Sequence, residues 1–457
     1  MDLLIKGGTV VTVGGRARVD VGIEAGRVVQ MGGAMSADRE VDAQDCFITP
    51  GGVDPHVHLT NPNLAPDGPK WSDDFESGTR AAIAGGITTV GNMSFSGQDE
   101  TLLDAITRDD ADASAHAIAD YFLHPVMLYP SEGNLAAIAP LHAQGHTSIK
   151  FFLSFQSFDR HVPEFLEAMQ IVKRAGGIAM IHCEDAAIIE CCCSLLREAG
   201  MTDPRYFPES RPVQAESVST YRAVGYAETT GCPVYIVHLA SARALAACHD
   251  GRSRGVPVYV ETRPLYLHLT KERFEEEDGA KYAGAPPLRD QTDVDAMWAA
   301  LSFGNIDSLA TDHAPWKLAE KLDAEFDATN LRQGVADLET SLPMLYSTGV
   351  LGGRISLEQF VAVTSTNSAK LFGLYPQKGT IQVGSDADMV VWDDNETRII
   401  DGATMQSRAD YSPYDGFKVT GWPKYTICRG EVVLDGKTVV GLPGRGQLVR
   451  RGPHRAI

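Results

Sequence analysis

Long apolar runs are absent from this sequence of 457 residues. No stretch of about 18 apolar residues occurs, so we expect no helix that crosses a membrane. The opening residues, Met1 to Lys6, do not have the layout of a signal peptide and indicate the start of a strand. We therefore expect a globular protein of the cytoplasm.

Basic residues are outnumbered by acidic ones. The chain has 40 Lys and Arg against 60 Asp and Glu, which gives a formal net charge of −20. Such an acidic protein repels phosphate groups, which argues against nucleic acid or an anionic membrane as a partner. The eight cysteines also lack the spacing of a disulfide framework or of a C-x2-C zinc site. Cys191, Cys192 and Cys193 are adjacent, and we interpret them as thiols in a reducing cytosol.

The middle of the chain, residues 52–375, alternates short β-branched runs with Ala-rich helical segments. The expected strands include Ser148 to Phe152, Ile178 to Ile181, Val234 to Val237, Val256 to Val260 and Ser308 to Ala310. This alternation predicts a parallel sheet with helical crossovers, and about eight repeats favour a (β/α)8 TIM barrel. A doubly wound sheet is the alternative, but no G-x-G-x-x-G motif opens a helix here.

Both ends of the chain have the sequence pattern of short β-strands instead. Residues 1–51 and 376–440 contain short strands separated by Gly-containing turns. The simplest account is a small β-sandwich domain built from both termini, with the α/β barrel inserted between them. Residues 441–457 are rich in Gly and Arg, and we expect a loosely ordered tail.

A His-x-His pair follows the Gly-bounded segment that enters the barrel. Residues two apart on a strand point to the same side, so His56 and His58 aim two imidazoles at one point. Later strands end in further polar residues, and such positions meet the substrate in a barrel. These residues are Lys150, His182, His238 and Asp312.

Four histidines and one aspartate suit a borderline divalent ion such as zinc. They exceed the needs of one tetrahedral site with an open position, which makes two ions plausible. Two ions need a bridging anion, and a lysine ammonium has no lone pair to offer. The spacing of these residues alone does not identify the bridging anion.

The ordered set of motifs resembles the cyclic amidohydrolases, which are the dihydropyrimidinases, hydantoinases, allantoinases and dihydroorotases. The resemblance runs from about residue 1 to 440. It includes Gly52 to Leu59, Pro286-Pro287-Leu288-Arg289, Ala369 to Gly373, Gly384 to Asp388 and Tyr411 to Gly416.

The resemblance implies a ligand set and a mechanism. His56, His58 and Asp312 would hold one metal ion, His182 and His238 a second, and N6-carboxylated Lys150 would bridge both together with a hydroxide. Two ions lower the pKa of the bridging water. Asp312 would take the hydroxide proton and pass it to the leaving nitrogen. The resemblance also implies a homotetramer.

The expected reaction is the opening of a small cyclic amide or ureide ring of the hydantoin or dihydropyrimidine type. Dihydroorotase-like enzymes place an Arg shortly after His-x-His, but here Leu59 to Leu64 contain no basic residue, and none occurs before Lys70. A substrate carboxylate would therefore lack its partner. Allantoinase or cyclic imide hydrolase is the alternative. The stretch Leu338 to Pro343 resembles the L-hydantoinase and allantoinase side of the family, and Phe155 keeps hydantoinase and allantoinase both open. A non-catalytic scaffold of this fold is disfavoured, because all six ligand positions are filled.

Three positions expected to contact the substrate depart from the family pattern. Phe155 stands five residues after Lys150, where hydantoinases and dihydropyrimidinases carry a Tyr whose hydroxyl helps hold the carbonyl oxygen. Ala285 replaces a Ser that usually acts through its backbone, and Gln333 with Gly334 replaces an Asn-Gly pair. Loss of an oxyanion donor weakens catalysis by a few kcal/mol in other enzymes.

Overall fold

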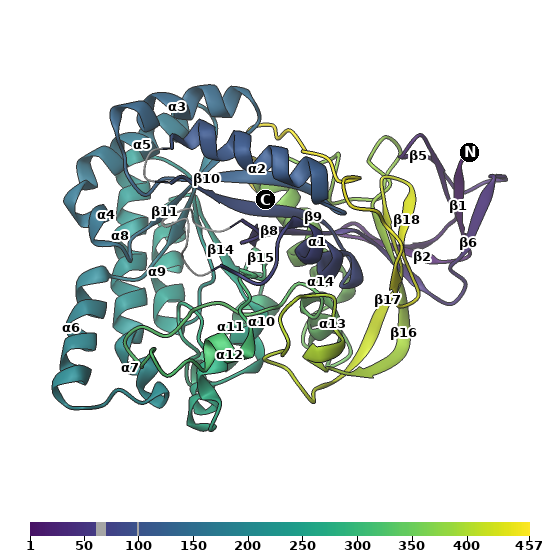
Figure 1. The fold of residues 1–457 in the computed structure, drawn as a ribbon. Coiled ribbons are helices and arrows are strands. Elements are labelled where there is room, and N and C mark those ends of the chain that lie inside the picture. Colours follow the sequence, from purple (N-terminus) through teal and green to yellow (C-terminus); the bar gives the residue numbers. More distant parts are fainter. Residues whose placement is uncertain (61–69, 98–99) are drawn as a thin grey trace.

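The computed structural model describes residues 1–60, 70–97 and 100–457. Its middle part forms a barrel of parallel strands, seen in Figure 1 with helices around it. The strands are β8 (Gly52–Val57), β9 (Ile87–Phe95), β10 (Asp120–Val126), β11 (Ser148–Phe152), β12 (Ile178–His182), β13 (Val234–Ile236), β14 (Val258–Thr262) and β15 (Ser308–Leu309). They pair in chain order, and the two ends of the sheet meet where Asp312 N donates to His56 O at 2.8 Å and His58 N to His313 O at 2.9 Å. The predicted TIM-like barrel is confirmed.

Several helices begin where the sequence offers a polar cap. Asp74 caps α1 by accepting from Ser77 N at 3.0 Å, and Asp185 caps α6 by accepting from Ile188 N at 3.1 Å. The helices are α1 (Phe75–Ala84), α2 (Leu102–His116), α3 (Glu132–Ala143), α4 (Gln156–Arg160), α5 (Val162–Arg174), α6 (Ala186–Glu198), α7 (Phe207–Ser210), α8 (Val213–Thr230), α9 (Ala242–Ser253), α10 (Pro264–His268), α11 (Gln291–Ser302), α12 (Leu318–Lys321), α13 (Ser341–Leu345), α14 (Leu357–Val361) and α15 (Asn367–Leu371). Within the described ranges, none of them has the length and apolar character needed to span a bilayer.

The two termini build a sandwich of two sheets beside the barrel (Figure 1). Its strands are β1 (Leu3–Lys6), β2 (Thr9–Thr12), β3 (Gly15–Arg18), β4 (Val21–Glu24), β5 (Arg27–Met31), β6 (Arg39–Asp42), β7 (Phe47–Pro50), β16 (Met389–Ile399), β17 (Lys418–Cys428), β18 (Glu431–Asp435) and β19 (Thr438–Val439). One sheet has the order β5-β4-β1-β6 and the other β19-β18-β17-β16-β7-β2-β3. Apolar side chains of both sheets, such as Ile23 and Val391, share one core. This confirms the predicted β-sandwich, while the exact domain limits stay predictions.

The segment 441–457 is packed against the barrel, which corrects the expectation of a loosely ordered tail. Tyr121 N donates to Gln447 O at 3.0 Å. The Arg451 side chain is 5 % exposed, and its Nη2 atom donates to Leu123 O at 2.8 Å. Composition misled because many of the contacts are made by backbone groups and by the side chains of Arg445 and Arg451, which an apolar pattern does not reveal.

Candidate metal centre and substrate cavity

A cavity of about 210 Å³ opens at the carboxyl ends of the barrel strands. Its lining contains every residue that the sequence singled out: His56, His58, Lys150, Phe155, His182, His238, Ala285, Asp312 and Gln333. His56 lies on β8, Lys150 on β11 and His182 at the end of β12, while the others follow strands or lie on loops. The structure thus brings the predicted residues together, and their individual roles stay predictions.

The first group of candidate ligands gathers around one oxygen atom. Asp312 Oδ1 lies 2.9 Å from His58 Nε2 and 3.1 Å from His56 Nε2. The ligand atoms of these three residues all lie within 4.8 Å of one another. Asp312 has a positive φ of 49°, which costs energy in a residue other than glycine and is typical of functional sites.

The second group lies next to the first. His182 Nδ1 is 2.9 Å from His238 Nε2, and Lys150 Nζ is 3.5 Å from His56 Nε2. His238 also has a positive φ, of 39°. Burial lowers the pKa of Lys150 to about 8, against the opposing charge of Asp312. Its amine is therefore more easily deprotonated than that of an exposed lysine.

Two glutamates orient the histidines, and the sequence interpretation assigned neither of them. Glu261 Oε1 is 2.9 Å from His56 Nδ1 and accepts from His238 N at 2.7 Å. Burial raises the pKa of Glu261 to about 8, although two N–H donors on one oxygen favour its carboxylate form. Glu184 Oε2 is 2.8 Å from His182 Nε2 and also accepts from Arg211. The predicted strand ends at Val260, and site residues were expected at the ends of strands. A strand predicted one residue longer would have included Glu261 as a candidate.

Arg263 is a further residue that the sequence interpretation missed. Its guanidinium is fully buried, and Nη1 donates to Asp312 Oδ2 at 3.0 Å. Burial alone would raise the pKa of Asp312, but electrostatic interaction with the His56 ring and the Arg263 guanidinium holds it well below its usual range. Asp312 therefore stays ionised, with Oδ1 turned toward the two histidines.

The hydrogen-bond pattern fits cations between these groups. His56 donates through Nδ1 to Glu261, so in the neutral imidazole the lone pair of Nε2 faces the Asp312 carboxylate. His182 donates through Nε2 to Glu184, so the Nδ1 lone pair faces His238. Burial lowers the pKa of all three histidines, which keeps them neutral. These ring nitrogens and the Asp312 carboxylate together form a nitrogen and oxygen ligand set suited to zinc-like ions.

Aromatic side chains line the outer part of the cavity. They are Trp71, Phe95, Phe152 and Phe155. The Phe152 ring lies 5.3 Å from that of Phe155 and 5.4 Å from that of His182. Phe155 follows β11 and is 43 % exposed, and its phenyl ring offers no hydrogen-bond donor. The segment Asn61 to Leu64, where an arginine was sought, lies outside the described residues.

Comparison with known proteins agrees with this geometry. The model of the Amidohydrolase family matches residues 47–201 and 237–433. The chain therefore belongs to the amidohydrolase family. It is 36 % identical to a D-hydantoinase of Ralstonia pickettii, covering 100 % of both chains, and 37 % identical to a D-phenylhydantoinase of Escherichia coli O1:K1 / APEC, covering 99 % of both. A solved D-hydantoinase structure superimposes with a TM-score of 0.96 at 36 % identity, with 100 % of both chains covered.

Proposed function

We propose that this protein opens the ring of a cyclic amide or ureide, of hydantoin or dihydropyrimidine type, by hydrolysis of a ring C–N bond. One observation carries the proposal: the candidate ligands and the candidate substrate contacts line the same small cavity. Full-length similarity to hydantoinases at 36 % identity supports it. A cavity of about 210 Å³ also suits a small ring rather than a polymer.

Two divalent ions, zinc in our proposal, would be held by the six candidate ligands. His56, His58 and Asp312 would hold one ion, His182 and His238 the other, and N6-carboxylated Lys150 would join them. Such ions supply a nucleophilic hydroxide at neutral pH and polarise the carbonyl group. The lowered pKa of Lys150 supports its carboxylation, because only the neutral amine adds carbon dioxide.

The residues of the chain divide the remaining work. Asp312 accepts the proton of the attacking water on its carboxylate and donates it to the ring nitrogen as the C–N bond breaks. Arg263 holds Asp312 in place through Oδ2, and Glu261 and Glu184 fix the orientation of His56 and His182. Groups held in this way need little reorganisation during the reaction.

The aromatic part of the cavity sets the substrate preference in this proposal. Phe155 would contact an apolar substituent on the ring, and the backbones of Ala285 and Gln333 would contact its polar edge. Because Phe155 brings no hydroxyl, the protein should be slow on plain dihydrouracil and faster on a ring with a hydrophobic substituent.

The test is a substrate panel with the metal-loaded protein: dihydrouracil, alkyl and aryl hydantoins, allantoin and cyclic imides, each assayed for ring opening. Turnover of a hydantoin or dihydropyrimidine supports the proposal. Turnover of allantoin or an imide alone favours the alternative function, that of an allantoinase or cyclic imide hydrolase. A protein that purifies without metal, fails to bind zinc and opens no ring is a scaffold.

We also propose a cytoplasmic homotetramer. The free state of the cysteines supports the location. Exposed apolar side chains on α6 and α8 support the assembly, since Leu195 is 59 % exposed and Tyr221 is 49 % exposed. Subunit association would cover such side chains. Light scattering decides the point, because a monomer contradicts the assembly.

A further inference from the structure

Lys321 ends the short helix α12, and its side chain is only 1 % exposed. Its Nζ atom donates to the carbonyl oxygens of Ala283 at 2.7 Å, of Gly334 at 3.0 Å, and of Arg332. These oxygens match the three N–H donors of an ammonium group. Burial and the Arg263 charge lower the pKa of Lys321, whereas the three acceptors favour its charged form.

The carbonyl groups belong to two loops that form one wall of the candidate substrate cavity. Ala283 is two residues before Ala285, and Arg332 directly precedes Gln333 and Gly334. Ala285, Gln333 and Gly334 line the cavity. The loops are also joined directly, because Gly334 N donates to Ala283 O at 2.9 Å. Lys321 therefore connects both loops from behind the wall.

The second loop is confined on its other sides as well. Gly334 has a φ of +117°, and a Cβ atom there would lie 2.2 Å from Ala314 O. Gln333 O accepts from Trp316 Nε1 at 2.8 Å. The loop thus runs close against Ala314, which lines the same cavity. The Lys321 side chain ties this loop to the loop of Ala285 through hydrogen bonds to both.

We propose that Lys321 is a positioning residue for the ring-opening reaction. It holds the two loops together, so that the backbone of the wall meets the substrate ring in one fixed geometry. The inference rests on the proposed function, because it assigns Lys321 to the same cavity. Lys321 acts through Ala285 and Gln333 and is not itself among the lining residues. A displacement of about 1 Å in such a wall costs about 100-fold in rate.

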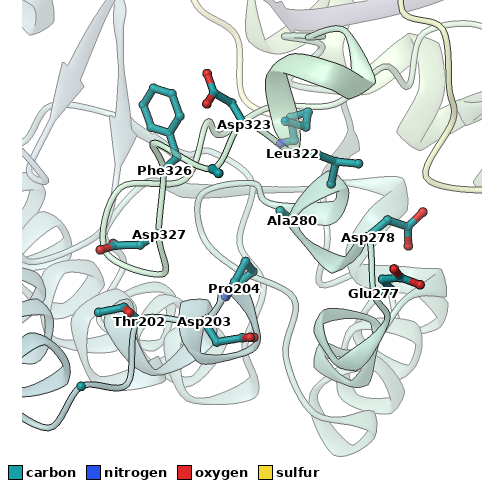
Figure 2. Close-up of a pocket in the computed structure, with 13 residues that line it drawn as sticks. Thr202, Asp203, Pro204, Glu277, Asp278, Ala280, Leu322, Asp323, Phe326 and Asp327 are labelled. Atoms are coloured by element: carbon teal, nitrogen blue, oxygen red, sulfur yellow. The ribbon is translucent and has the colours of Figure 1, made fainter.

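The far side of Lys321 borders a second, larger hollow of about 1030 Å³. Figure 2 shows acidic side chains from several loops around it: Asp203, Glu277, Asp278, Asp323 and Asp327. Their charge attracts small cations. The hollow therefore offers a route by which an added amine can reach the place of a shortened Lys321 side chain.

The first measurement compares Lys321→Met with Lys317→Met. Lys317 lies at the start of the same helix, is exposed and donates to Arg408 O. We expect kcat/KM on the best ring substrate to fall about 100-fold in Lys321→Met, with unchanged metal content, and to stay at the wild-type value in Lys317→Met. Wild-type kinetics in Lys321→Met overturn the proposal.

Hydrogen exchange at the Gly334 amide tests the wall without any substrate. It should become about tenfold faster in Lys321→Met, the equivalent of one net hydrogen bond. If the wild-type protein opens no ring, the proposed function is wrong. Independently of that outcome, an unchanged exchange rate of the Gly334 amide in Lys321→Met overturns the role of Lys321. If Lys321→Met is not recovered folded, Lys321→Gln replaces it, because its amide keeps N–H donors. The Gln amide has two N–H donors for three carbonyl groups, so Lys321→Gln should show a smaller fall in kcat/KM and a smaller rise in exchange than complete loss of the donors. Wild-type values of both in a folded Lys321→Gln count against the proposal.

Chemical rescue separates positioning from general stability. The atoms lost in Lys321→Ala correspond to propylammonium, which carries N–H donors for the carbonyl groups. Added propylammonium should restore part of kcat/KM in Lys321→Ala and leave wild type unchanged. Tetramethylammonium, which is charged but has no N–H group, should restore nothing. Equal effects of both cations, or no effect of either on a folded variant, overturn the proposal.

Discussion

Glu261 holds two of the candidate ligand residues through a single oxygen atom. Its Oε1 atom lies 2.9 Å from His56 Nδ1 and accepts from His238 N at 2.7 Å. The side chain is 0 % exposed, so neither bond is shared with bulk water. The informative change is Glu261→Gln, which keeps the shape and an acceptor oxygen but removes the carboxylate charge that the two N–H donors favour and that bound cations would favour further.

The expected loss follows from the strength of these hydrogen bonds. A bond to a charged group contributes about 1.5–3 kcal/mol, against about 0.5–1.5 kcal/mol for a neutral pair. The difference, about 1–1.5 kcal/mol for each bond, corresponds to about a tenfold change in an equilibrium constant. Because His56 and His238 are both affected, we expect Glu261→Gln to lower metal affinity about 10- to 100-fold.

Competition with a chromophoric chelator measures the metal affinity, and kcat/KM is then taken at saturating metal. Glu216→Gln is the matched control, since Glu216 is also buried and accepts from Ala240 N at 2.7 Å without contacting a candidate ligand. Its metal affinity should equal that of wild type, whatever the change in unfolding midpoint. Equal affinities in wild type and Glu261→Gln, or equal losses in both variants, would refute the reasoning.

Other changes test the substrate side, the bridge and the fold. Phe155→Tyr should raise kcat/KM on dihydrouracil more than on an aryl hydantoin, by up to about 100-fold, because it restores a donor for the developing oxyanion; no change on either ring, or an equal change on both, removes Phe155 from the specificity argument. Lys150→Ala should abolish turnover, and propionate in solution should restore part of it; a metal-loaded variant that stays inactive contradicts a bridging carboxylate. Glu339→Gln should flatten the pH dependence of the free energy of unfolding, which urea denaturation at several pH values measures. Burial raises the pKa of Glu339 from 4.5 to about 7, so its contribution is complete below pH 4.5 and is lost as the pH rises through 7; a wild-type slope in the variant contradicts this.

The barrel was predictable because its strands are buried on both faces and therefore form short apolar runs. The run Ser148 to Phe152 became β11 with the same limits. The strand β3 was not predictable in this way. Its residues Gly15 to Arg18 are mostly exposed and carry two arginines, and backbone pairing with β2 holds them in the sheet. Patterns of apolar residues do not record such edge strands.

The candidate ligands were predictable for a related reason, since each lies on or directly after an apolar strand of the barrel. Glu261, Arg263 and Lys321 act through another residue, and their partners are distant in the sequence. Arg263 meets Asp312, and Lys321 meets backbone carbonyl groups of two loops. A single sequence contains no signal that pairs these residues, so their roles emerge only from the folded chain.

Residues with unusual backbone conformations lie at the candidate metal site. Asp312 and His238 adopt positive φ values of 49° and 39°, and neither is a glycine. His56 Nε2 lies 3.1 Å from Asp312 Oδ1, and His182 Nδ1 lies 2.9 Å from His238 Nε2. A fold that is otherwise consistent tolerates such local costs where a bound group offsets them. The strain and this gathering of ligand atoms are therefore two reasons, beyond residue type and spacing, for proposing cations at the mouth of this barrel.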